Sequence, residues 1–293
     1  MRPQAVLFDL DNTLVMEDGA TFAAVRSACA VASGHAGAPA DALFTALPLV
    51  AEKQWKESPV LAYTDRMGIW WGEGLWGEFR GETAELQALH DFVPGFRAAV
   101  WREALAAVGV SDEALAVEVA ETYRTVRRGR QLVDPEADAL LSALARDHRL
   151  ALVTNGAPDV QREKLAGTTL ARYFGAIIVS CEVGFGKPDR RIFETALDRI
   201  GAKADETVML GDSLARDVAG AHAAGIRAVW IDRHLWAGEE GPAPDVRIES
   251  LSELPAALAA LARRAASALG SRAPRPGSAP GASRPRASRR EDR

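Results

Sequence analysis

The sequence predicts an α/β protein, a Rossmann-like doubly wound parallel sheet that carries a mostly helical inserted domain. Short apolar runs alternate with helical stretches from residue 134 onward, as in repeated strand, helix and strand units. One further apolar run, residues 4–8, ends in two aspartates and is followed by a long stretch with few strand signals. We therefore expect a core of residues 1–15 and 134–269, an inserted helical domain of residues 16–133 and a disordered tail of residues 270–293.

The first strand determines where chemistry is expected. Residues 4–8 are rich in branched and aromatic side chains, which favours a buried strand. Asp9 and Asp11 follow at once, and a desolvated carboxylate costs several kcal/mol unless it is paired or binds a metal. The strand must therefore end near Asp9 and present both acids at its carboxyl end, where open α/β sheets bind ligands.

The inserted region is predicted to be mostly helical. A polar turn is expected at residues 17–19, and no helix is extended through the centre of residues 67–77, where glycine and tryptophan alternate. Pro94-Gly95 and Gly109 mark expected helix boundaries. The expected helices span residues 21–33, 41–55, 94–108 and 111–127.

Aromatic and basic side chains in this region are candidates for substrate contact. Packing in a helical core or at a dimer contact is favoured over an aromatic substrate wall for the tryptophans, because aromatic clusters usually pack. These are Trp55, Trp70, Trp71, Trp76 and Trp101. No spacing selects among the polar candidates Arg66, Arg80, His90 and Arg97.

After residue 134, strands and helices alternate regularly. Two of the expected helices have a proline in the first turn, at Pro135 and Pro158, where proline fits. The expected strands are residues 150–153, 176–179, 207–210 and 228–231, and the expected helices are residues 135–147, 158–165, 190–200, 214–224 and 251–269.

Polar residues follow three of the predicted strands, and a lysine lies in a loop between the last two. They are Asp9 and Asp11, Thr154 and Asn155, Asp212, and the loop residue Lys187. Because the carboxyl ends of parallel strands meet at one edge, we expect these side chains to share a crevice. Clustered carboxylates suit Mg²⁺ and leave room for a phosphate. The lysine would neutralise charge, and Thr154 and Asn155 would donate to phosphate oxygens, so the pattern indicates phosphoryl transfer.

Four motifs in this order resemble those of the haloacid dehalogenase-like (HAD) hydrolase superfamily, in its C1-capped phosphatase type. They are Asp9-Leu10-Asp11-Asn12-Thr13, Thr154-Asn155, Gly186-Lys187-Pro188-Asp189 and Gly211-Asp212-Ser213-Leu214-Ala215-Arg216-Asp217. Each motif alone is common by chance, whereas four in order at one predicted sheet edge are specific. The resemblance covers residues 4–15 and 134–235, and the helical insertion stands where that superfamily has its cap.

The resemblance implies a role for each site residue. Asp9 would be the nucleophile that forms an aspartyl-phosphate, and Asp11 the general acid and then the base. Asp9, the backbone carbonyl of Asp11 and Asp212 would bind Mg²⁺. Asp217 would orient metal-bound water or Lys187. Lys187 and Thr154 would hold the phosphoryl group and Asn155 would line the pocket, whereas Thr13 and Ser213 are expected only to cap or to bond within loops.

The acid at position 11 favours a phosphatase. HAD dehalogenases lack it, so its presence implies cleavage of a phosphate monoester of a small metabolite, such as a nucleoside monophosphate, a sugar phosphate or a phosphoglycolate-like acid. A phosphonate hydrolase would need a Schiff-base lysine from the cap, and Lys53 and Lys56 are expected to face solvent. A sugar phosphomutase stays open, because cap closure and water exclusion are not readable from sequence. A non-catalytic binding module is disfavoured by the complete set of motifs.

Composition limits the partners. A net charge of −5 argues against general nucleic-acid binding and leaves only the arginine-rich tail as a candidate for it. No apolar run approaches the roughly 20 residues of a membrane span, and the N-terminus lacks a signal pattern. Cys29 and Cys181 lack metal-ligand spacing and suggest a reducing compartment, so we predict a cytoplasmic protein. We expect a monomer or a homodimer. The tail is expected to be solvated and without specific function.

Overall fold

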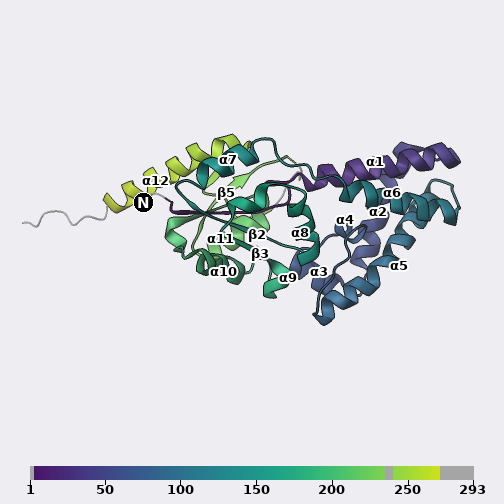
Figure 1. Cartoon of the computed structure of the whole chain (residues 1–293), viewed down its shortest axis with the longest axis horizontal. Coiled ribbons are helices and arrows are strands. Elements are labelled where there is room, and N and C mark those ends of the chain that lie inside the picture. Colours follow the sequence, from purple (N-terminus) through teal and green to yellow (C-terminus); the bar gives the residue numbers. More distant parts are fainter. Residues whose placement is uncertain (1–2, 235–239, 271–293) are drawn as a thin grey trace, which may run out of the picture.

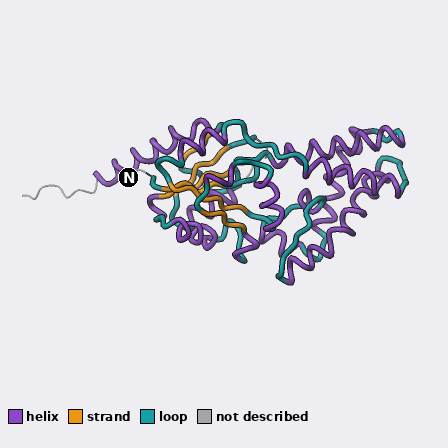
Figure 2. The backbone as a smooth tube through the Cα atoms, viewed as in Figure 1, coloured by secondary structure: helices purple, strands orange, loops and turns teal. Residues whose placement is uncertain are grey.

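The computed structural model describes residues 3–234 and 240–270, and its central feature is a six-stranded parallel sheet (Figures 1 and 2). The strand order is β3-β2-β1-β4-β5-β6, and every neighbouring pair is parallel. The strands are β1 (Ala5–Phe8), β2 (Arg149–Thr154), β3 (Ala176–Val179), β4 (Thr207–Gly211), β5 (Arg227–Ile231) and β6 (Val246–Ile248). The predicted fold class is confirmed.

Helices cover both faces of this sheet. On one side lie α7 and α12, and on the other lie α10 and α11 (Figure 1). Side chains of β1 alternate accordingly, since Val6 and Phe8 belong to the core under α7 and α12 while Leu7 packs with α10 and α11. The helices of this part are α7 (Ala137–Leu144), α8 (Pro158–Ala166), α9 (Ser180–Val183), α10 (Arg190–Ile200), α11 (Ala219–Ala223) and α12 (Leu254–Gly270).

The segment between β1 and α7 forms a second body of helices (Figure 1). Its core is continuous, with Trp76 and Trp101 fully buried, and α1 packs on α6 while α2 packs on α5. The same apolar cluster includes Val160 of α8 and Cys181 of α9, so the two bodies share a packed boundary. The helices are α1 (Glu17–Ala36), α2 (Ala40–Lys56), α3 (Leu61–Met67), α4 (Trp71–Gly74), α5 (Ala84–Ala107) and α6 (Glu113–Arg128).

Three local predictions in the inserted region are wrong. The expected polar turn at residues 17–19 is the first turn of α1, because Glu17 is buried against distant cations. The expected boundary at Pro94-Gly95 lies inside α5, where packing against α2 and α6 outweighs the helix-breaking tendency of proline. The tryptophan-rich segment contains the short helix α4 at its centre.

Two differences concern the sheet domain. The expected helix at residues 214–224 is divided into a π-helical turn, Leu214–Val218, and α11. Strand β6 was not predicted, since three residues are too few to show a period. The predicted disordered tail lies outside the described residues from position 271 onward.

Candidate active site

Asp9 follows β1 directly and is almost fully buried. Its backbone N–H donates to the carbonyl of Leu210 in β4 (2.9 Å), so sheet hydrogen bonding holds the residue at the strand end. Its carboxylate forms an ion pair with Lys187 and accepts a hydrogen bond from Thr13 Oγ1 (3.2 Å). Burial raises the pKa of Asp9 despite the neighbouring lysine. Thr13 therefore contacts the predicted nucleophile, a contact that the sequence reasoning did not expect.

Lys187 is buried between two carboxylates. Its ammonium contacts Asp9 and lies 2.7 Å from Asp217 Oδ1. Burial alone would lower the pKa of Lys187, but Asp217 and Asp9 outweigh burial and raise it, so the side chain carries its positive charge.

Asn155 fixes the backbone of Lys187. Its side-chain oxygen accepts from the Lys187 N–H (2.8 Å), and its side-chain nitrogen donates to the Lys187 carbonyl (3.0 Å). Both ends of the amide are thus engaged by the loop, so the side chain positions Lys187, and its expected contact with phosphate stays a prediction. Thr154 is buried beside it, and its hydroxyl donates to the Asn155 carbonyl (3.3 Å).

The end of β4 supplies the remaining acids. The carboxylate oxygens of Asp9, Asp212 and Asp217 lie within 4.8 Å of one another. A Cβ atom on Gly211 would stand 2.2 Å from Asp217 Cγ, so only glycine lets this carboxylate pack over the strand end. Asp217 Oδ2 also accepts from the Ser213 N–H (3.0 Å). Trp230 of β5 donates to the Asp212 carbonyl (2.7 Å) and holds the start of the loop.

This cluster fits a divalent cation. Three carboxylates converge, and one ammonium in contact with two of them leaves an excess of negative charge. Carboxylate oxygens are hard ligands of the kind that Mg²⁺ prefers. Asp217 was predicted to orient metal-bound water or Lys187. Its carboxylate lies in the same group as those of Asp9 and Asp212, at the expected metal site.

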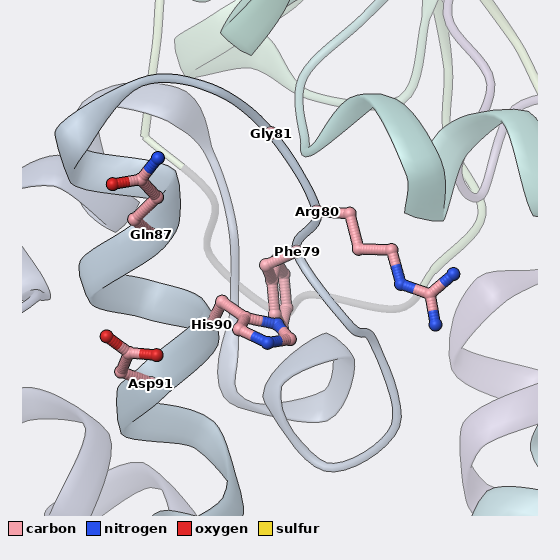
Figure 3. A pocket seen from close by; sticks show the side chains of 6 residues that line it. All are labelled: Phe79, Arg80, Gly81, Gln87, His90 and Asp91. Carbon is pink, nitrogen blue, oxygen red and sulfur yellow. The ribbon is translucent and has the colours of Figure 1, made fainter.

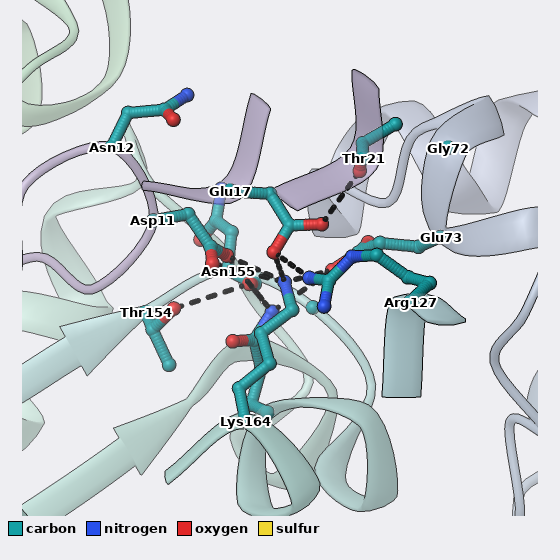
Figure 4. A network of polar contacts seen from close by, with 12 residues as sticks. Asp11, Asn12, Glu17, Thr21, Gly72, Glu73, Arg127, Thr154, Asn155 and Lys164 are labelled. Atoms are coloured by element: carbon teal, nitrogen blue, oxygen red, sulfur yellow. Dashed lines mark hydrogen bonds and ion pairs between the residues drawn. The ribbon is translucent and has the colours of Figure 1, made fainter. Parts of the chain in front are cut away.

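The Asp11 carboxylate belongs to a network of charged side chains around the buried Lys164 (Figure 4). Its carboxylate oxygens lie 2.9 and 3.0 Å from Lys164 Nζ, and Gln161 donates to it (3.2 Å). Lys164 also contacts Glu73 of α4 and Glu17 of α1. Sequence reasoning missed these partners, because a lysine and a glutamine on a predicted helix carry no motif that marks them.

The basic candidates of the inserted region do not converge on the site. Arg66 stacks over Tyr63, and Arg97 is buried, donating to the backbone carbonyls of Gly74 and Gly77. Arg80 and His90 line a separate pocket of about 440 Å³ with Phe79 (Figure 3). In Figure 3 the Arg80 side chain extends away from the other labelled side chains. None of the predicted catalytic residues lines it.

A doubly wound sheet with buried aspartates and a lysine at its carboxyl edge, joined to an inserted helical body, defines a class of α/β hydrolases. The chain belongs to the haloacid dehalogenase-like hydrolase family, whose model matches residues 3–225. The predicted resemblance is confirmed.

Several relatives of the chain are named as phosphatases. The chain is 40% identical to phosphoserine phosphatase of Thermus thermophilus over 250 residues, which span 85% of this chain and 96% of that protein. It is 27% identical to human N-acylneuraminate-9-phosphatase, over 88% of this chain and 94% of that protein. Among solved structures, a HAD phosphatase from Thermococcus onnurineus matches with a TM-score of 0.54 and 26% identity, over 87% of this chain and 97% of that chain.

Magnesium-bound YfnB from Bacillus subtilis matches with a TM-score of 0.55 and 24% identity, over 88% of this chain and 99% of that chain, and this likeness shows the fold alone. Within the described part of the chain, no helix combines the length and apolar character needed to cross a bilayer.

Proposed function

We propose that the protein is a Mg²⁺-dependent phosphatase that cleaves a phosphate monoester of a small metabolite through an aspartyl-phosphate. The observation that carries this proposal is the position of Asp9, paired with Lys187 and gathered with Asp212 and Asp217 at the sheet edge. Membership of the hydrolase family and the phosphatase relatives support it.

The proposed reaction has two steps. An oxygen of Asp9 attacks phosphorus and forms the P–O bond of an aspartyl-phosphate, while the bond to the leaving oxygen breaks and Asp11 gives that oxygen a proton. Water then attacks, Asp11 takes its proton, and Asp9 and inorganic phosphate are released. Lys187 neutralises the charge on the phosphoryl oxygens, Thr154 donates to one of them, and Asn155 keeps the Lys187 loop in place.

Asp9, Asp212 and the backbone carbonyl of Asp11 are the proposed Mg²⁺ ligands, with Asp217 beside them. When bound, the metal neutralises charge on the phosphate and the attacking carboxylate. The surplus of acid over base at this edge is the feature of this chain that supports binding of such a cation.

We propose that residues 1–15 and 134–269 form the catalytic core and that residues 16–133 are the cap that selects the substrate. The relative with 40% identity is named for phosphoserine, so O-phosphoserine is the first metabolite to test, followed by sugar phosphates and nucleoside monophosphates. Cys29 and Cys181 are both free and buried, which agrees with the predicted cytoplasmic location.

The test is hydrolysis of p-nitrophenyl phosphate with Mg²⁺ and with EDTA, by the wild type and by Asp9→Asn. We expect phosphate release that needs Mg²⁺ and disappears in the variant, while Asp198→Asn, an exposed aspartate on α10, stays active. Wild-type inactivity on this ester and on a panel of phosphorylated metabolites would rule the proposal out.

A further inference from the structure

Lys164 of α8 is fully buried and contacts three carboxylates at once. Its ammonium lies 2.9 Å from Asp11, 2.8 Å from Glu73 and 3.1 Å from Glu17 (Figure 4). A buried lysine is rare unless it is paired, so this side chain is held by its partners. The mechanism proposed above assigns it no role.

The three acids come from different parts of the chain. Asp11 lies in the loop after β1, whereas Glu17 begins α1 and Glu73 lies in α4 of the helical body. One ammonium of the sheet domain thus joins the catalytic loop to two elements of the inserted region. Figure 4 shows these side chains converging on Lys164.

Gln161 repeats the same pattern one turn earlier on α8. Its side-chain nitrogen donates to Asp11 (3.2 Å), to Glu73 (3.1 Å) and to the carbonyl of Asn155 (2.9 Å). Residues three apart on a helix share a face, so Gln161 and Lys164 present two donors side by side. Together they reach both oxygens of Asp11.

The distribution of charges in this network makes Asp11 depend on Lys164. Arg127, which is buried on α6, also pairs with Glu17, so that acid has a second cation. Among the described residues, Lys164 is the cation in contact with Asp11 and Glu73, and one oxygen of Glu73 has no hydrogen-bond partner there. Without Lys164, the Asp11 carboxylate would lie near Glu17 and Glu73 and would have no cation in contact. Repulsion between these carboxylates would then turn Asp11 away from the other two acids.

We infer that Lys164 and Gln161 are positioning residues that fix the orientation of the Asp11 carboxylate. Glu73 of the inserted region contacts the same Lys164 ammonium. The inference rests on the proposed function, because it assigns these residues to the proton-transfer group of that reaction. It concerns the direction of the carboxylate, so it predicts an effect on proton delivery to the leaving oxygen.

The experiment compares two esters of nearly the same shape, phenyl phosphate and p-nitrophenyl phosphate. The nitro group makes the leaving phenolate a weaker base, so this ester depends less on a general acid. We measure kcat/KM, which covers formation of the aspartyl-phosphate, for wild type, Asp11→Asn and Lys164→Met. In both variants we expect the loss with phenyl phosphate to exceed the loss with p-nitrophenyl phosphate about tenfold, which is a part of the roughly 10²–10⁴-fold that a general acid contributes.

The outcomes separate the inference from the proposed function. Equal losses on both esters in Lys164→Met, with unequal losses in Asp11→Asn, would overturn the inference and leave the phosphatase intact. Equal losses in Asp11→Asn would remove the general-acid role and the inference with it. A wild type without turnover would overturn both.

Two further variants guard against a folding artefact. Lys203→Met changes an exposed lysine and should match the wild type on both esters. If Lys164→Met does not fold, Gln161→Leu tests the inference by the same comparison of kcat/KM losses on the two esters. It removes the contacts to Asp11 and Glu73 without removing a buried charge.

Discussion

The side-chain amide of Asn155 makes hydrogen bonds to both the N–H and the carbonyl of Lys187, 32 residues further along the chain. This pair of bonds sets the direction in which the lysine leaves its loop. The ammonium then reaches Asp9 and Asp217. A residue at the end of β2 therefore controls the charge beside the nucleophile without being bonded to that nucleophile.

Asn155→Ala should lower kcat/KM for p-nitrophenyl phosphate by about tenfold to a hundredfold, because each lost bond to a buried group costs about 1–3 kcal/mol and frees the Lys187 loop. Gln87→Ala, at an exposed position on α5, is the control and should leave kcat/KM unchanged. An Asn155→Ala enzyme with wild-type kinetics would show that the loop holds Lys187 unaided.

Gly211→Ala should weaken Mg²⁺ dependence. The added Cβ would stand 2.2 Å from Asp217 Cγ, so that carboxylate must move out of the acid cluster. We expect a higher Mg²⁺ concentration for half-maximal activity, measured by metal titration. Gly34→Ala is the matched control: nothing lies within 4 Å of its Cβ, and alanine in a helix should raise the free energy of unfolding by about 0.5–1 kcal/mol. An unchanged titration in Gly211→Ala would contradict the close packing of Asp217.

Adjacent arginines on α6 should differ sharply in their effect on stability. Arg127 is fully buried on Glu17, so Arg127→Met leaves a buried carboxylate with one cation fewer and should cost about 3–5 kcal/mol of unfolding free energy. Arg128 is 34% exposed and pairs with Glu78, so Arg128→Met should cost about 0–1 kcal/mol. Chemical denaturation measures both, and equal costs would contradict the buried network.

Glu73 should make stability depend on pH in a defined direction. Burial and the nearby acids Asp11 and Glu17 raise its pKa from 4.5 to about 7, despite Lys164. Between these values the folded state binds the proton more tightly, so the contribution of Glu73 to stability falls as pH rises from 4.5 to 7. The unfolding free energy of wild type minus that of Glu73→Gln should fall over this window. A constant or rising difference would contradict the raised pKa.

Much of the fold could be predicted because its signals are local. Strands at residues 150–153, 176–179 and 207–210 lie within β2, β3 and β4, since continuous apolar runs between turn residues favour buried parallel strands. Asp9, Lys187 and Asp212 were expected to meet at the carboxyl edge of the sheet, and the structure gathers them there together with Asp217. The roles assigned to them stay predictions.

The errors have a common cause. Glu17 resembles a turn residue by its polarity, yet it begins a buried helix because Arg127 lies 110 residues away in the sequence and beside it in space. Pro94 resembles a boundary, yet its helix continues because both sides of α5 are packed. Helix propensity differs by at most about 0.7 kcal/mol among ordinary residues and costs about 3 kcal/mol for proline, and tertiary packing overrides it.

The sequence by itself determined five of the six described strands, the order of the motifs and the edge at which the acids gather, because these signals lie within a few residues of each other. Only the tertiary structure decided which way Asp11 points, since Lys164, the cation that holds it, lies 153 residues away. No local pattern encodes such a contact. It exists because burying a lysine requires acids around it, and those acids come from residues 11–17 and from α4, both far from Lys164 in the sequence.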